Sequence, residues 1–209
     1  SEITKYFELL PDHSSLKMEY NQLSGLTEKE LKSKQDLLRK KIKPGAIDIN
    51  IMTKIDKVNH TNNNEALPVE YNDAHASFRG FANSELTSSV VLSAGLNPRL
   101  YSYMSNFDDF FPDEKGIQKK KIVLKVSDYR SAYIQGKFLA KKGLWISEFR
   151  IESGLNCGGH AFATDGFLLG PILNEFKENK KNLISSLFEI YSSTLNSLKK
   201  PVPATIPST

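Results

Sequence analysis

The chain has 209 residues, enough for one domain with a real core, and its 39% hydrophobic and 25% charged residues are typical of a soluble globular protein. Its net charge of +4 comes from 28 basic and 24 acidic residues, a balance too mild to indicate nucleic-acid binding. It has no apolar run of membrane-spanning length and no signal-peptide pattern at its start, so no membrane contact is expected. The single cysteine, Cys157, excludes an internal disulfide and a multi-cysteine zinc site. We therefore expect a cytoplasmic location and no metal.

In chain order, residues 1–26 are expected to be an irregular N-terminal segment. Thr27 and Glu30 form a capping-box pattern that predicts the start of a helix, and Pro44-Gly45 stops it. Strands are then predicted at 47–52, 90–94, 121–126 and 144–151. Helices are predicted at 72–81, 99–105, 129–141, 165–179 and 182–199. Residues 201–209 are expected to be a tail or the truncated start of another strand.

Strands that alternate with helices favour a parallel sheet, because parallel neighbours need a crossover connection. The long excursion at 106–116 contains three phenylalanines, which favour packing onto the domain over a partner surface. Basic runs at 39–41, 119–121, 141–142 and 199–200 are expected to be solvated edges, not a phosphate-binding stripe.

In a parallel α/β protein, binding residues gather where the strands end. The fourth predicted strand is followed by Gly158, Gly159 and His160. Two glycines let a backbone approach a ligand closely, and an imidazole there can exchange a proton near neutral pH. Without the histidine, a plain turn is the better interpretation of the glycine pair. Lys125, at the end of the third strand, supplies a positive charge to the same edge or is simply solvated.

Cys157 is an alternative nucleophile, but nothing in the sequence places a base in contact with it. A Cys-x-x-His metal half-site would need two more ligands, and His13, His60 and His75 lack the spacing.

Four successive segments of the chain resemble the nitronate monooxygenase family (2-nitropropane dioxygenases), which are FMN-dependent β/α-barrels. The segment 154–160, Gly-Leu-Asn-Cys-Gly-Gly-His, resembles that family's Gly-x-Glu-Ala-Gly-Gly-His loop and is the specific match. The three weaker matches are Ile-Asn-Ile-Met at 49–52, Ser-Ala-Gly-Leu-Asn-Pro at 93–98 and Ile-Val-Leu-Lys-Val-Ser at 122–127. The resemblance covers roughly residues 27–178.

The resemblance implies a TIM-type (β/α) barrel, incomplete in this chain, with about four βα units over residues 27–200. It makes His160 the catalytic acid/base and puts Lys125 at the N1–C2=O edge of the flavin. The other residues that it places near FMN are Asn50, Ala94, Gly95, Asn156, Gly158 and Gly159. It also implies a small-molecule substrate, with NADH or NADPH as a candidate electron donor.

Two features depart from the family pattern. Asn156 stands where the family usually has an acidic residue, and the loop at 161–166 differs. Both touch the substrate side of the site. The same loop also resembles that of the FMN-dependent enoyl reductases, so an FMN-dependent enoyl reductase stays open as an alternative, as does a degenerate barrel acting as a subunit or scaffold. A full barrel has eight strands, so the remainder is expected from a longer polypeptide or another chain.

Overall fold

The computed structural model describes residues 2–43, 48–51, 56–152 and 169–207. They belong to two compact units, Ser1–Gly45 and Ala46–Thr209. No helix among these residues is long and apolar enough to cross a membrane.

The N-terminal unit consists of α1 (Glu2–Glu8), α2 (Ser15–Asn21) and α3 (Glu28–Lys41). The predicted irregular segment was therefore wrong, since two helices occupy most of it. Each has seven residues, too short for a periodic apolar pattern to stand out in the sequence. The predicted capping box at Thr27 is present, and the Glu30 carboxylate accepts hydrogen bonds from both the amide and the hydroxyl of Thr27.

The second unit contains a four-stranded parallel sheet with the order β1-β2-β3-β4. The strands are β1 (Ile49–Ile51), β2 (Ser89–Leu92), β3 (Lys121–Val126) and β4 (Ile146–Ile151). All four lie where the sequence predicts them, and the mixed α/β class with a parallel sheet is confirmed. Each strand pairs with the next in the chain, so the order never reverses among the described strands.

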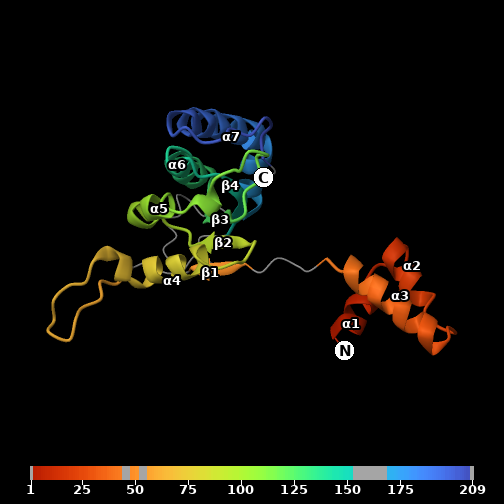
Figure 1. Cartoon of the computed structure of the whole chain (residues 1–209). Helices are drawn as coiled ribbons and strands as arrows, with labels where there is room; N and C mark the ends of the chain where they lie inside the picture. Colours follow the sequence, from red (N-terminus) through yellow and green to blue (C-terminus); the bar gives the residue numbers. More distant parts are fainter. Residues whose placement is uncertain (1, 44–47, 52–55, 153–168, 208–209) are drawn as a thin grey trace. The chain divides into compact units, whose positions relative to one another are not determined.

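The connections are helical: η1 (Val69–Tyr71) and α4 (Asp73–Ala82) follow β1, α5 (Pro98–Met104) and η2 (Asp108–Phe110) follow β2, and α6 (Tyr129–Ala140) follows β3. Figure 1 shows α4 to α7 stacked beside the strands in the same order as the strands themselves. Side chains fix two helix starts, because Asn97 accepts a hydrogen bond from the Leu100 amide and Asp128 accepts one from the Ser131 amide.

A single helix, α7 (Leu169–Ser197), replaces the two that the sequence predicts. The polar residues at 179–182 predict a break, but they include no glycine or proline, and residues 180–182 are exposed. One apolar stripe continues past them, made of Ile172, Phe176, Leu183, Leu187, Tyr191 and Leu195, all buried.

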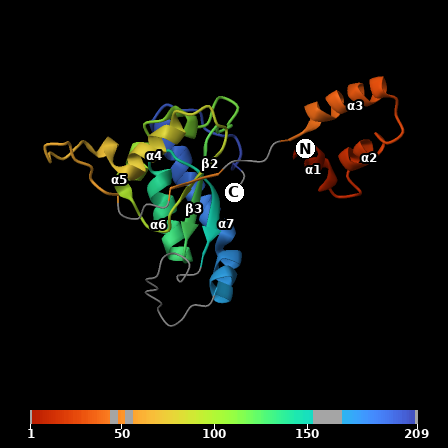
Figure 2. The same cartoon turned by 90° about the horizontal axis from the view of Figure 1, so that it is seen from below.

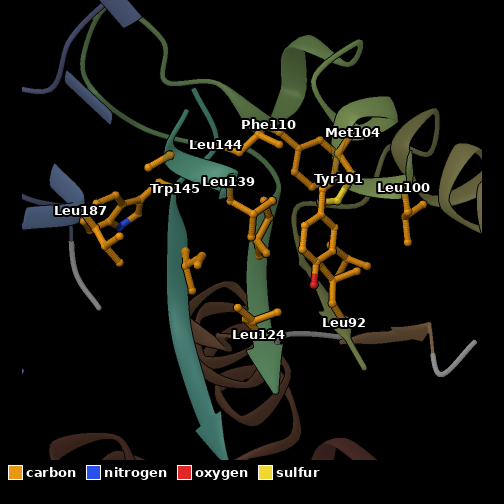
Figure 3. Packing of buried hydrophobic residues seen from close by; sticks show 14 of the residues in the cluster. Leu92, Leu100, Tyr101, Met104, Phe110, Leu124, Leu139, Leu144, Trp145 and Leu187 are labelled. Carbon is orange, nitrogen blue, oxygen red and sulfur yellow. The ribbon is translucent and has the colours of Figure 1, made fainter. Parts of the chain in front are cut away.

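The sheet has two distinct faces, because side chains alternate along each strand. The helix face carries Leu92, Leu124 and Val126, which join the helices in one core. Figure 3 shows Leu92 and Leu124 beside Tyr101, Met104 and Leu139 in this core.

The strand register places a different set on the opposite face, which we call the polar face. Asn50 pairs with Val91, Val91 with Val123, and Lys125 with Arg150. Val91 and Val123 are buried there as well.

The end of the sheet where the strands begin, the amino edge, is closed by packed side chains. Lys120, directly before β3, is fully buried, and its ammonium donates to the carbonyls of Ala82 and Ser84 and to the Asp109 carboxylate. The prediction that residues 119–121 form a solvated edge is therefore wrong for Lys120. Phe110 and Phe111 are buried, which confirms that the excursion packs onto the domain.

Candidate functional site

The end of the sheet where the strands finish, the carboxyl edge, carries those sequence-predicted site residues that the structure describes. Asn50 is exposed on β1, and Lys125 is half-buried near the end of β3. Both belong to the polar face. Asn50 pairs with Val91 and Val91 with Val123, and Lys125 lies two residues after Val123 on β3, so its side chain is on the same face. Two residues from separate motifs thus share one face of one sheet.

Lys125 pairs with Glu152, the first residue after β4, at 2.7 Å between Nζ and Oε1. Its side chain is 14% exposed, and that of Glu152 is 23% exposed. The amide of Glu152 donates to the Val126 carbonyl, so the end of β4 is fixed against β3. The positive charge at the end of β3 is therefore held in place by an adjacent carboxylate, a partner that the sequence reading did not identify.

A second group of charges spans the polar face. Nη2 of Arg150 lies 3.0 Å from Asp48, directly before β1, and its Nε lies 2.6 Å from Glu148. These hydrogen bonds, first the one to Asp48, raise the pKa of Arg150. Asp48 precedes one edge strand and Arg150 lies on the other, three strand spacings away, or about 14 Å in a flat sheet. Two side chains bridge such a gap only if the sheet curls toward this face.

The tip after β2 contains Ala94 and Gly95. Ala94 is half-buried and Gly95 is exposed, and a Cβ added to Gly95 would meet no other atom within 4 Å. The Tyr101 hydroxyl donates to Gln135 Oε1 at 2.8 Å, and the Gly95 carbonyl lies 3.4 Å from the same hydroxyl as a second, longer acceptor. Burial raises the pKa of Tyr101. The tip is thus attached to α5, with open space above Gly95.

The remaining predicted site residues, Asn156, Gly158, Gly159 and the catalytic candidate His160, lie outside the described residues, as does Cys157. Their relation to Lys125 and Asn50 stays a prediction.

The structure also shows a polar pair that the sequence does not predict. His75, near the start of α4, is buried, and its Nδ1 lies 2.6 Å from the Asp56 carboxylate. The two residues are 19 positions apart, so no local motif joins them. The one available signal was a histidine in the first turn of a predicted apolar helix.

Comparisons of the chain with protein-family models, with curated proteins and with solved structures found no match. Within the described residues, no group of three or more histidine, cysteine, aspartate or glutamate side chains could hold a metal ion. The arrangement at the carboxyl edge therefore has to be judged from its own chemistry.

The polar face offers the ammonium of Lys125 and the side-chain amide of Asn50, together with the buried side chains of Val91 and Val123. Lys125 can stabilise negative charge on a flat ring, and Asn50 can donate to or accept from the edge of the ring. Three carboxylates, Asp48, Glu148 and Glu152, accompany the two cations on this face. This charge balance suits a ring system better than a phosphate group.

Proposed function

We propose that this chain is the central part of an FMN-dependent oxidoreductase of the nitronate-monooxygenase type. The flavin ring would lie against the polar face at the carboxyl edge of the sheet. The observation that carries the proposal is the common face of Asn50 and Lys125, which the family resemblance assigns to one cofactor from two separate strands.

The strand order supports a barrel as the complete architecture. In the described sheet, the spatial order of the strands follows their order in the chain. In a doubly wound sheet, by contrast, the strand order reverses at the crevice where the ligand binds. The ion pair between Asp48 and Arg150 supports the same architecture, since strands of a barrel curl and tilt around a common interior. The polar face would then be the interior of the barrel.

FMN fits this face through its ring. When bound, FMN supplies the transfer of an electron pair to or from a substrate. Lys125 would hold negative charge at the N1–C2=O edge, Asn50 would hydrogen-bond to the ring, and Val91 and Val123 would lie beneath it. The phosphate of FMN has no counterpart among the described residues of the carboxyl edge, because Arg150 is paired with Asp48 and Glu148 and the proposal assigns Lys125 to the ring.

The partner in this proposal is the rest of a barrel, from a longer polypeptide or another chain. Within the described residues, β1 and β4 each pair with one strand only. Unpaired strand edges bind other strands readily, and the later units of a barrel would also supply the phosphate site.

His160 is proposed as the acid/base group that exchanges a proton with a small-molecule substrate beside the flavin. The test is an anaerobic titration of the intact protein with nitroalkanes, with enoyl thioesters and with NADH or NADPH, followed by the visible flavin spectrum. We expect His160→Ala to abolish turnover while the flavin stays bound, and His60→Ala, on an exposed loop, to have no effect.

Bleaching by a nitroalkane supports the proposal, whereas bleaching by a nicotinamide followed by reduction of the enoyl thioester favours the enoyl reductase. An intact protein with no flavin, which also fails to take up added FMN, would contradict the proposal and favour a scaffold. An unchanged turnover rate in His160→Ala would remove the assignment of the acid/base group alone.

A further inference from the structure

An open pocket of about 440 Å³ lies among the helices of the second unit. It lies where η1 and α4 meet α5, and Figures 1 and 2 show α4 and α5 side by side. Six residues line it: Val69, His75, Arg99, Ser102, Tyr103 and Asn106. The proposed flavin chemistry uses none of them.

The floor of the pocket contains a histidine with a fixed orientation. Asp56 accepts hydrogen bonds from the Ala74 amide at 2.9 Å and the Asn72 side chain at 3.4 Å, and its Oδ2 lies 2.6 Å from Nδ1 of His75. Because a carboxylate only accepts hydrogen bonds, Nδ1 of His75 is the donor and Oδ2 of Asp56 the acceptor. Nε2 of His75 is then the polar atom of the ring that remains for a ligand, and it makes no hydrogen bond with a described residue.

Tyr103 forms a rigid apolar wall beside that histidine. Its ring centroid lies 5.0 Å from that of His75 and 5.2 Å from that of Phe107, and it meets Phe78 edge-on. Arg79 reaches the Tyr103 hydroxyl at 3.5 Å. The wall is therefore held from both its ring and its hydroxyl, and the pocket is formed before any ligand arrives.

The rim of the pocket carries hydrogen-bond donors from one side of α5 and its extension. Arg99, Ser102 and Asn106 follow one another at helical spacing, so they present a guanidinium, a hydroxyl and an amide to the same side. Arg99 is exposed and makes no ion pair with any residue that the structure describes. A guanidinium at the mouth of a pocket, with no carboxylate partner among the described residues, is suited to bind the carboxylate of a ligand.

We infer that this pocket binds a small-molecule carboxylate with a flat apolar body. The carboxylate would meet Arg99, with Ser102 and Asn106 as further donors. The apolar body would lie between Val69 and Tyr103, above the ring of His75. His75 is not needed for chemistry in this site; held by Asp56, it gives the floor one polar atom at a fixed position. The inference does not depend on the flavin proposal.

The experiment uses the full chain labelled with ¹⁵N and sodium benzoate as the probe. The chain has four histidines, so the His75 ring signals are assigned from His75→Gln, or from single variants of the other three if that variant fails to fold. We expect benzoate to produce a saturable shift of the His75 Nε2 signal. We expect Arg99→Gln to weaken the affinity at least tenfold, while Arg130→Gln, an exposed arginine on α6, leaves it unchanged.

Benzyl alcohol, which has the same ring without the charge, is the matched ligand control and should bind at least tenfold more weakly. The inference is overturned if benzoate produces no saturable shift, which would leave the Asp56–His75 pair a purely structural contact. Equal affinity in Arg99→Gln, or equal affinity for benzyl alcohol, would also overturn it, because the carboxylate would then not be recognised.

Discussion

The lysines at the two ends of the parallel sheet differ in burial and in their partners. At the amino edge, Lys120 is fully buried, and two carbonyls and one carboxylate bind its ammonium. At the carboxyl edge, Lys125 keeps part of its surface exposed beside Glu152, on a face that also carries Asn50. Lys120 therefore stabilises the packed amino edge, whereas Lys125, five residues later, lies at the edge where parallel sheets bind ligands. Exposure and partners, and not residue type, distinguish a structural cation from a candidate functional one.

The largest effect expected from this comparison is that of Lys120→Met. The change leaves two buried carbonyls without their donor and Asp109 without its buried partner. Asp109 is 34% exposed and keeps Lys119 as a partner, so the main loss comes from the two carbonyls. An unsatisfied buried polar group costs about 1–3 kcal/mol, so urea unfolding should show a loss of about 2–4 kcal/mol. Lys119→Met is the matched control, since Lys119 binds the same carboxylate from a side chain that is 45% exposed, and exposed pairs contribute about 0–1 kcal/mol. Equal losses in the two variants would mean that burial does not distinguish these lysines.

The next effect concerns glycines at the two edges. Gly143, before β4, has a φ of +72°, and an added Cβ would lie 2.9 Å from a Phe111 ring carbon and 3.1 Å from Leu198. Backbone strain and overpacking together predict that Gly143→Ala lowers the free energy of unfolding by about 2 kcal/mol. Gly95→Ala, at the carboxyl edge, meets only backbone strain and should cost about 1 kcal/mol. A larger thermal destabilisation for Gly95→Ala would contradict the view that the amino edge is the closed end.

A smaller, pH-dependent effect is expected from Asp109, whose side chain is 34% exposed. Hydrogen bonds from Lys119 and then Lys120 lower the pKa of Asp109 below the ordinary 3.8. A carboxyl with a lowered folded pKa contributes stability that is complete above the ordinary pKa and is lost as the pH falls through the folded pKa. The difference in free energy of unfolding between the wild type and Asp109→Asn should therefore be largest near neutral pH and shrink in acid. A difference that grows in acid would show that these ion pairs do not lower the pKa.

Much of the fold could be predicted because its signals are local. Apolar β-branched runs mark β2 and β3, and Asn97 and Asp128 mark the starts of the helices that follow. The two short N-terminal helices were missed because seven residues do not complete a readable period. The continuity of α7 through 179–182 could not be predicted, because a run of four polar residues within a long helix looks the same in sequence as a loop.

The candidate site could be predicted only residue by residue. Asn50 and Lys125 were found by their positions at strand ends, and the register of the sheet was needed to put them on one face. Glu152 and Asp48 could not be assigned as partners, because the contacts join separate strands. The same reason hid the pairing of Asp56 with His75, and the burial of Lys120 depends on carbonyls 36 and 38 residues earlier in the chain.

The central claim is that the carboxyl edge of the polar face holds a flavin ring beside Lys125, and a flavin-binding titration of two lysine variants tests it most directly. Lys125→Met and Lys121→Met alter the same strand and the same face, at its carboxyl and amino ends. The account predicts that Lys125→Met weakens the affinity for both FMN and riboflavin about tenfold, the equivalent of about 1.4 kcal/mol, while Lys121→Met binds as the wild type does. Equal affinities in all three proteins, or an equal loss in both variants, would contradict it.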